Sequence, residues 1–294
     1  GELMSKINTI VNNTIIASPM NYIGGKAKLL PQILPNFPTK INTFYDVFAG
    51  GANVAVNINA ENIKINDLNH YVIDILKVFY EKDIDILLNQ IYRLIGEYDL
   101  SKTNEQGFKA FRDAYNKKQD PVMLYTLICY SFNYQFRFNN NMQYNNPFGR
   151  ERSQFSQKLA DKLVRFSTKL KEKNIEFSCL NFEDFLAIRD YQTDDFVYLD
   201  PPYLITTGSY NDGNRGFKHW TKSQELLLLD FLEKLDKQGV QFALSNVLEH
   251  KGKTNDILKS FSQKYRIIEL DKHYNNSCYN TQKTGSNEIL LVNY

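Results

Sequence analysis

Short apolar runs alternate with helical patterns along the first and last parts of the chain. The apolar runs have the length of buried strands and are rich in β-branched and aromatic residues. They cover residues 43–48, 64–66, 176–179, 196–199, 241–244, 265–270 and 288–292. Strands that alternate with helices favour a mostly parallel sheet, so we predict an α/β fold of about seven strands with helices on both faces.

One helix is clearly delimited, over residues 221–238. Thr221 and Gln224 form a capping box at its start, and Gly239 follows its end. Apolar residues at helical spacing predict the side that packs against the sheet: Leu226, Leu229, Phe231 and Leu232.

The pattern changes between residues 83 and 154. Three helical runs come first, at 84–98, 104–116 and 122–132. They lead into a stretch, 133–141, that is dense in asparagine and aromatic side chains. We therefore predict an inserted helical subdomain at 83–154, with a hairpin-like tip near 139–146, between two parts of one α/β domain at 4–82 and 155–294.

Composition restricts the class of protein. The chain has 294 residues, of which 43% are hydrophobic and 23% charged, as in globular proteins. No apolar stretch has the length of a membrane span and the first residues are polar, so we expect a cytoplasmic protein. The cysteines Cys129, Cys179 and Cys278 are far apart and the four histidines are scattered. We expect reduced, buried thiols and no metal site.

The net charge of +2 hides a local excess of positive charge. Residues 137–173 contain nine lysines and arginines and three acidic residues. Such a segment is typical of a contact with a polyanion such as nucleic acid. The part from 158 to 173 is equally compatible with the solvated side of a helix.

The segment Asp200-Pro201-Pro202-Tyr203 follows the apolar run 196–199 and suits chemistry on an amino group. The amino nitrogen of a base such as adenine is a poor nucleophile unless acceptors hold its hydrogens. Asp200 and the carbonyl of Pro201 offer such acceptors, and the prolines make the turn stiff. Tyr203 offers a flat surface on which a base can stack. The alternative is a purely structural role, in which the segment only ends a strand.

Two further segments favour a nucleoside ligand. In Asp46-Val47-Phe48-Ala49-Gly50-Gly51-Ala52-Asn53, glycines stand where a strand turns into a helix, so the backbone can approach a ligand closely. Asp67 follows Phe48 by nineteen residues, where an acidic side chain typically binds ribose hydroxyls. The glycine pair alone is equally typical of a tight turn.

An upstream Gly-Gly-Lys segment, residues 24–26, adds Tyr22 and Lys26 as candidates. Tyr22 could cover an adenine or sulfonium group, and Lys26 could pair with a ligand carboxylate. Taken alone, this segment is a Gly-Gly turn with an exposed lysine.

Together these segments resemble the Dam-type (D12 class, α group) DNA adenine-N6 methyltransferases, and the resemblance covers most of the chain. The similar segments are 21–30, 46–57, 64–69, 136–139 with 146–150, 182–186 and 200–203. The order of cofactor loop, insert and Asp-Pro-Pro-Tyr is that of the α group. The resemblance implies a Rossmann-like methyltransferase sheet that binds S-adenosylmethionine, with 83–154 as the target-recognition subdomain.

The resemblance also implies roles for individual residues. The S-adenosylmethionine site would include Tyr22, Lys26, Phe48, Gly50, Asp67 and Asp200, with Asn181 and Phe182 beside the cofactor adenine. Catalysis would fall to Asp200, Pro201, Pro202 and Tyr203. DNA would be contacted by Arg137, Phe138, Asn139, Gln143, Arg150 and Arg152, with Phe138 as a wedge in the duplex.

Two departures from the family pattern bear on the cofactor loop and on specificity. The cofactor loop reads Phe-Ala-Gly-Gly-Ala instead of Phe-x-Gly-x-Gly. The hairpin at 140–144 lacks the arginine that some GATC-specific relatives use to read guanine, and Asn and Gln favour adenine instead. The sequence therefore does not predict GATC specificity.

The function that these observations favour is site-specific methylation of a flipped adenine in double-stranded DNA, with no metal and with a separate restriction endonuclease as a possible partner. The protein would then lie at the nucleoid through its DNA. The glycine-rich segment 207–216 is a candidate lid, and 274–285 is a second candidate for sequence recognition. Alternatives are methylation of RNA adenine or of cytosine N4, and an inactive DNA-binding module. A nicotinamide oxidoreductase would need a full Gly-x-Gly-x-x-Gly turn, which residues 48–53 lack.

Overall fold

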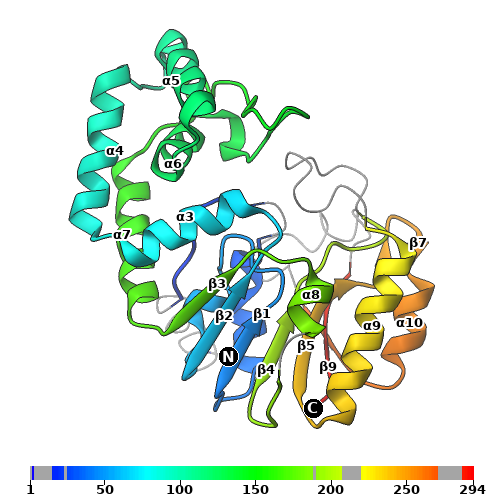
Figure 1. Cartoon of the computed structure of the whole chain (residues 1–294). Coiled ribbons are helices and arrows are strands. Elements are labelled where there is room, and N and C mark those ends of the chain that lie inside the picture. The colour runs from blue at the N-terminus through cyan, green and yellow to red at the C-terminus, as the bar shows by residue number, and fades with distance from the viewer. Residues whose placement is uncertain (1, 3–14, 23–24, 188–189, 207–219, 271–286) are drawn as a thin grey trace.

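The structure is a computed structural model that describes residues 2, 15–22, 25–187, 190–206, 220–270 and 287–294. A seven-stranded sheet in the order β3-β2-β1-β4-β5-β9-β8 forms its centre (Figure 1). The strands are β1 Thr43–Asp46, β2 Asn62–Asn66, β3 Ile175–Ser178, β4 Phe196–Leu199, β5 Gln241–Val247, β8 Arg266–Glu269 and β9 Glu288–Val292. β9 runs antiparallel to its neighbours β5 and β8, and the other pairs are parallel. The predicted α/β sheet is confirmed.

Alternating side chains divide the core between the two faces of the sheet. In β4, Phe196 and Tyr198 join one apolar cluster, while Val197 and Leu199 join the other, because successive side chains of a strand point to opposite faces. The first cluster is covered by α3 (His70–Glu81) and by the short helices η1 (Ala27–Leu29), α2 (Leu30–Ile33) and η2 (Leu34–Asn36). The second is covered by α8 (Phe182–Ala187), α9 (Lys222–Lys237) and α10 (Asp256–Ser262). Helices therefore pack on both faces, as predicted.

The predicted helix near 221–238 is present as α9. Thr221 and Gln224 form the capping box, and Gly239 has a φ of +77°. The predicted apolar side was partly wrong, because Leu226 is 56% exposed. The leucines that pack inward are Leu228, Leu229, Leu232 and Leu235.

Four helices lie to one side of the sheet, next to α3 (Figure 1). They are α4 (Ile84–Tyr98), α5 (Glu105–Lys118), α6 (Pro121–Cys129) and α7 (Gln157–Lys171). From Val122 to Cys129 every residue of α6 is buried, because α3, α4 and α5 surround this helix. The apolar core runs without a break from the sheet through α3 to α6. The division of the chain at 83 and 154 stays a prediction.

The segment between α6 and α7 folds back on itself. Ser131 pairs with Phe148 and Phe138 with Tyr144 in antiparallel bridges, and the short helix η4 (Phe132–Tyr134) lies between Ser131 and Phe138 in the chain. The backbone N–H of Asn139 donates to the carbonyl of Gln143 at 2.8 Å. The predicted hairpin-like tip is therefore present, within residues 138–144.

Some predictions concern features outside the core. Cys129 is buried as expected, but Cys179 is exposed, and Cys278 lies outside the described residues. The candidate lid at 207–216 and the candidate recognition loop at 274–285 also lie outside them. Within the described ranges, no helix has the length and apolar character needed to cross a bilayer. A two-stranded hairpin of β6 (Glu249–His250) and β7 (Lys253–Thr254) follows β5.

Candidate active site

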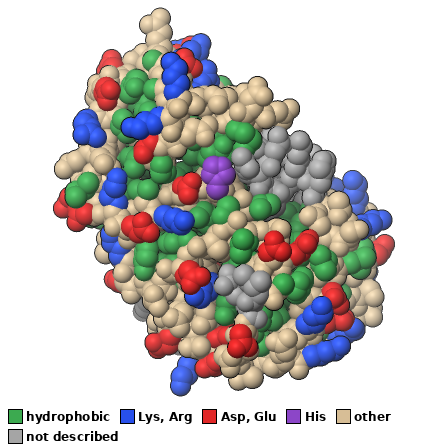
Figure 2. All heavy atoms as spheres, in the orientation of Figure 1, with side chains coloured by type: hydrophobic (Ala, Val, Ile, Leu, Met, Phe, Trp, Pro, Cys, Tyr) green, Lys and Arg blue, Asp and Glu red, His purple; other side chains and the backbone are tan. Residues whose placement is uncertain are grey.

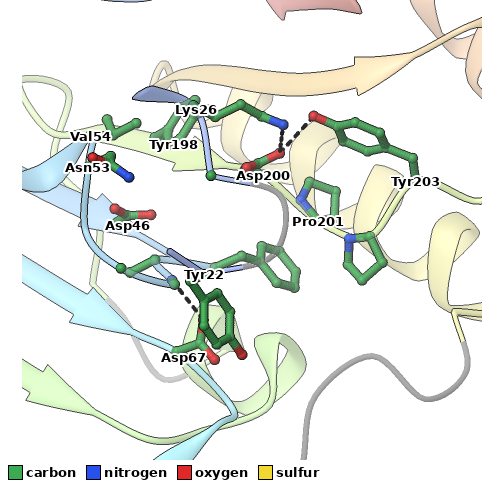
Figure 3. Close-up of a pocket in the computed structure, with 16 residues that line it drawn as sticks. Tyr22, Lys26, Asp46, Asn53, Val54, Asp67, Tyr198, Asp200, Pro201 and Tyr203 are labelled. Atoms are coloured by element: carbon green, nitrogen blue, oxygen red, sulfur yellow. Dashed lines mark hydrogen bonds and ion pairs between the residues drawn. The ribbon is translucent and has the colours of Figure 1, made fainter. Parts of the chain in front are cut away.

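The carboxyl ends of β1, β2 and β4 meet at one edge of the sheet, where the strand order reverses between β1 and β4. Open α/β sheets bind their ligands at such a point. A pocket of about 660 Å³, open to solvent, lies there (Figure 3). It is lined by Tyr22, Gly25, Lys26, Asp46, Phe48, Ala49, Gly50, Gly51, Asn53, Val54, Asp67, Tyr198, Asp200, Pro201, Pro202 and Tyr203. Segments far apart in the sequence thus form one site.

The glycine turn after β1 is held by the acidic residue after β2. The backbone N–H of Gly50 donates to Oδ2 of Asp67 at 2.8 Å, and the N–H of Asn69 donates to Oδ1 at 2.9 Å. Gly50 has a φ of +52°, and a Cβ atom at this position would lie 2.9 Å from the ring of Tyr22. A side chain at residue 50 would therefore be strained and would displace Tyr22. Asp67 lines the pocket, and a carboxylate is an acceptor that suits ligand hydroxyls.

The N-terminal segment forms the opposite wall of the pocket. The side-chain amide of Asn69 donates to the hydroxyl of Tyr22 at 3.0 Å, which fixes the ring beside the glycine turn. Lys26 is only 8% exposed, which excludes the simple exposed lysine of a surface turn. Its Nζ lies 3.4 Å from Oδ1 of Asp200 and 4.7 Å from the ring centroid of Tyr203. Lys26 thus pairs with the carboxylate of the Asp-Pro-Pro-Tyr turn.

The Asp-Pro-Pro-Tyr turn begins directly after β4. The hydroxyl of Tyr203 lies within donating distance of Oδ1 of Asp200, at 2.9 Å, and of Oε2 of Glu288, at 3.3 Å. Figure 3 shows Lys26 and Tyr203 converging on Asp200. Pro201 and Pro202 are buried and offer no N–H, so the backbone of these two residues adds no donor that would compete for the acceptors of the turn. This geometry suits a group that has hydrogens to donate.

Burial governs the charge of the pocket. It raises the pKa of Asp200 to about 6; Lys26 lowers this pKa and Glu288 raises it. Burial, and then the charges of Asp200 and Asp67, raise the pKa of Asp46 well above its usual value. Oδ1 of Asp46 is buried and has no hydrogen-bond partner among the described residues. Three carboxylates around one cavity favour a ligand with donor groups or positive charge.

The sequence prediction did not give Asp46 a role in the site, although it stands at the end of β1 as Asp200 stands at the end of β4. The same rule about strand ends would have found it. Asn53 and Tyr198 also line the pocket without having been predicted. Among the residues that the structure describes, no group of three or more His, Cys, Asp or Glu side chains is arranged to hold a metal ion.

Comparison with known proteins identifies the family. The model of the D12 class N6 adenine-specific DNA methyltransferases matches residues 22–276, which include the whole pocket. The chain belongs to this family. The sheet, with its single antiparallel strand β9 among the pairs described above, is consistent with the Rossmann-like methyltransferase fold expected from the sequence.

Several curated proteins are similar over nearly the whole chain. The type II methyltransferase M.FokI of Planomicrobium okeanokoites is 57% identical over 96% of this chain, and the modification methylase StsI of Streptococcus sanguinis is 50% identical over 95%. In both cases the match covers 43% of the relative, so the chain spans less than half the length of these proteins. The DNA adenine methylase of Escherichia coli K12 is 25% identical over 77% of this chain and 79% of its own length.

The two residues expected beside the cofactor adenine do not line the described pocket. Phe182 lies next to it, with ring centroids 5.8 Å from Phe48 and 5.3 Å from Trp220. Asn181 is exposed, and its Oδ1 accepts from the N–H of Asp184 at 2.8 Å, at the start of α8. Trp220 joins this aromatic cluster without having been predicted, since a lone tryptophan carries no motif.

For this member of the D12 class, the structure contradicts the predicted wedge. The ring of Phe138 is 0% exposed and stacks on Tyr71, with centroids 3.9 Å apart and ring planes 10° apart. In this arrangement Phe138 cannot enter a duplex, because it fills the core between the hairpin and α3. The exposed aromatic side chain of the segment is Phe132.

The other candidate DNA contacts lie nearer the surface. Arg137, Arg150 and Arg152 are exposed, and Arg150 pairs with Glu105 at 3.3 Å. Oδ1 of Asn139 accepts from the N–H groups of Asn141 and Gln143, so this side chain also shapes the turn. Gln143 is half-buried.

Part of the basic run is structural. Nζ of Lys171 donates to the carbonyl of Phe79 at 2.7 Å, and Nζ of Lys173 donates to that of Ile58 at 2.6 Å. Figure 2 shows lysines and arginines interspersed with acidic residues on the visible face instead of gathered in one band. The charge count along the sequence therefore includes two side chains, Lys171 at the end of α7 and Lys173 just after it, that donate to backbone carbonyls.

Proposed function

We propose that this chain transfers the methyl group of S-adenosylmethionine to N6 of a flipped adenine in double-stranded DNA, at a specific sequence. The observation that carries the proposal is the position of Asp200. Its carboxylate stands at the end of β4, in the pocket that also holds the glycine turn and the carboxylates of Asp46 and Asp67. Membership of the adenine-specific family supports the choice of substrate.

The pocket fits S-adenosylmethionine in its donor and acceptor groups. Asp67 can accept ribose hydroxyls, and the unsatisfied buried Oδ1 of Asp46 can accept from an ammonium group. Gly50 leaves the approach to the turn clear, where a Cβ would meet Tyr22. Phe48, with Phe182 and Trp220 behind it, gives an aromatic surface for adenine. When bound, the cofactor supplies an electrophilic methyl group.

The catalytic turn suits the acceptor amine. Asp200 and the carbonyl of Pro201 would accept the two hydrogens of N6, so that the nitrogen lone pair points at the methyl group. Tyr203 would stack on the extruded base, with its hydroxyl anchored by carboxylates. Positioning and electrostatics then perform the reaction without a covalent enzyme intermediate. Adenine must leave the base stack to reach a pocket at the sheet edge.

Sequence recognition would lie in the segment 133–152. The side-chain amide of Asn21 donates to the carbonyl of Asn133 at 3.2 Å, and Phe136 packs edge-on against Tyr22, which lines the pocket. The segment therefore adjoins the catalytic site. Gln143 and Asn139 at its tip are of the types that read bases, and Arg137, Arg150 and Arg152 would hold phosphates.

The names of M.FokI and StsI support a place in restriction-modification, with a cognate endonuclease that acts separately on unmethylated sites. Such a methylase would work in the cytoplasm, on the DNA of the nucleoid.

Radioactive methyl transfer tests the proposal. Purified protein is incubated with labelled S-adenosylmethionine and either unmethylated duplex DNA or structured RNA, and the nucleosides are separated after digestion. We expect label in N6-methyldeoxyadenosine from duplex DNA. Label in N4-methylcytosine or in RNA would replace the proposal with one of its rivals. Cofactor binding without any transfer would favour an inactive module.

A further inference from the structure

The carboxylate of Glu288, at the start of β9, contacts the hydroxyl of Tyr203 in the Asp-Pro-Pro-Tyr turn. It is distant from the turn in sequence, but β9 runs antiparallel to β5, with Glu288 opposite Val247 at the end of β5. A strand that runs opposite to the other strands of a sheet begins at the edge where those strands end. Glu288 therefore reaches the edge that holds Asp200, although it is not among the residues that line the pocket.

We propose that Glu288 is a positioning residue for methyl transfer, which holds the Tyr203 hydroxyl and through it orients the Tyr203 ring and the Asp200 carboxylate. This inference rests on the proposed function. The side chain of Glu288 is buried, and its carbonyl accepts from the N–H of Leu270 at 3.0 Å, which fixes its backbone. It is thus a rigid partner for the phenol.

The geometry around the phenol supports this role. The hydroxyl lies 2.9 Å from Oδ1 of Asp200 and 3.3 Å from Oε2 of Glu288, so one proton faces two acceptors. Burial, with Asp200 and Glu288 close by, raises the pKa of Tyr203 well above its usual value, and the hydroxyl stays protonated. Two anchor points beyond the ring limit its rotation and hold its face toward the pocket.

The same contacts decide which oxygen of Asp200 serves the substrate. Lys26 and Tyr203 both contact Oδ1. Oδ2 can therefore accept a hydrogen from the amine without loss of either contact. If Tyr203 turned away, Asp200 could rotate, and the amine would lose a fixed acceptor. Glu288 would thus affect turnover through orientation and not by touching the base.

The charged and polar groups around Asp200 allow a test through its pKa. Asp200 is faced by Lys26 from the N-terminal segment, Tyr198 from β4, Asp46 from the end of β1, Tyr203 from its own turn and Glu288 from β9. The charge of Glu288 raises the pKa of Asp200, whereas the hydrogen bond from Tyr203 lowers it. Removing these two groups one at a time should therefore move the pKa of Asp200 in opposite directions.

The experiment compares Glu288→Gln, Tyr203→Phe and the double variant in methylation of duplex DNA from pH 5 to 8. We expect Glu288→Gln to lower kcat about tenfold with unchanged cofactor affinity, since small misplacements in a site have effects of this size or larger. Its acid limb of kcat/KM should move to lower pH, and that of Tyr203→Phe to higher pH. The double variant should have a kcat close to that of Tyr203→Phe, because Glu288 acts through the phenol.

The matched control is Glu269→Gln, an exposed glutamate at the end of the neighbouring strand β8. It should leave kcat and the pH profile as in the wild type. An unchanged kcat and acid limb in folded Glu288→Gln, or losses that multiply in the double variant, would overturn the inference. If Glu288→Gln does not fold, Tyr203→Phe decides alone, and an unmoved acid limb counts against the inference. A wild-type protein that methylates nothing would instead refute the proposed function.

Discussion

The ammonium group of Lys26 lies 3.4 Å from Oδ1 of Asp200, so the segment before the sheet supplies the positive charge for the carboxylate at the end of β4. A carboxylate in a buried pocket is ionised at neutral pH only where a cation or hydrogen bonds stabilise it. Lys26 and the Asp-Pro-Pro-Tyr turn are therefore coupled through their charges.

This pairing predicts a pH dependence. Because Asp200 must be ionised to accept a hydrogen from the amine, kcat/KM of the wild type should decrease as the pH is lowered past about 6, the pKa of Asp200. Lys26→Met removes the charge that lowers this pKa, and the acid limb should move to higher pH. Lys28→Met is a matched control, since Lys28 is exposed two residues further on. An acid limb that does not move in Lys26→Met would show that Lys26 does not set the charge of Asp200.

We expect Asp46 to lower the stability of the fold while it contributes to the binding of S-adenosylmethionine. The pKa of Asp46 in the folded protein is raised well above its usual value of 3.8. Between these two pKa values the native state binds more protons than the unfolded state, so the free energy of unfolding falls as the pH rises through this range. Asp46→Asn removes the ionisable group. The variant should melt at a higher temperature than the wild type at pH 8, with a much smaller difference at pH 4, and should bind S-adenosylmethionine more weakly. A difference in melting temperature that is the same at both pH values would contradict this.

Asp67 should matter for the cofactor and not for DNA. Asp67→Ala removes both the acceptor for a ribose hydroxyl and the bond to the N–H of Gly50. A hydrogen bond to a charged group contributes roughly 1.5–3 kcal/mol, which is a loss of about 10- to 100-fold in cofactor affinity. Calorimetry with S-adenosylmethionine and a DNA-binding assay measure the two effects, with Asp74→Ala as control, since Asp74 is only partly buried and does not line the pocket. Equal affinity in Asp67→Ala and the wild type would remove Asp67 from the site.

Phe138 should act on stability. The ring is fully buried on Tyr71, so Phe138→Ala leaves a cavity and should cost about 3–5 kcal/mol of unfolding free energy. Phe132→Ala, in the same segment but exposed, should change it by less than about 0.5 kcal/mol. Chemical denaturation measures both. If Phe138→Ala unfolded like the wild type and lost only methylation, the wedge role would be restored.

Much of the site could be predicted because its residues follow a positional rule. Asp67 comes directly after β2 and Asp200 directly after β4, and parallel strands end at a common edge, so sequence order alone brings them together. The glycine turn could be predicted because a close backbone approach requires a residue without a Cβ. These features depend on a few neighbouring residues.

The features that could not be predicted depend on tertiary packing. Glu288 reaches the Tyr203 hydroxyl only because β9 is antiparallel to β5, which the apolar pattern of β9 does not reveal. Phe138 stands at the position of a wedge, but its contact with Tyr71 of α3 decides its burial. Lys171 at the end of α7 and Lys173 just after it add to the charge count, but they donate to carbonyls near the end of α3 and before β2. In each case the role of the residue depends on a contact with a residue that is distant in the sequence.

The rate of a single turnover with duplex DNA at saturating S-adenosylmethionine tests the central claim most directly, in the wild type and in Asp200→Asn. Asparagine keeps the size of the side chain but lacks the charge that holds the amine. We predict that the wild type forms N6-methyladenine and that folded Asp200→Asn does so on the order of a hundredfold more slowly or worse, because one preorganised partner of the reacting group is lost. A rate close to that of the wild type in folded Asp200→Asn would contradict the account.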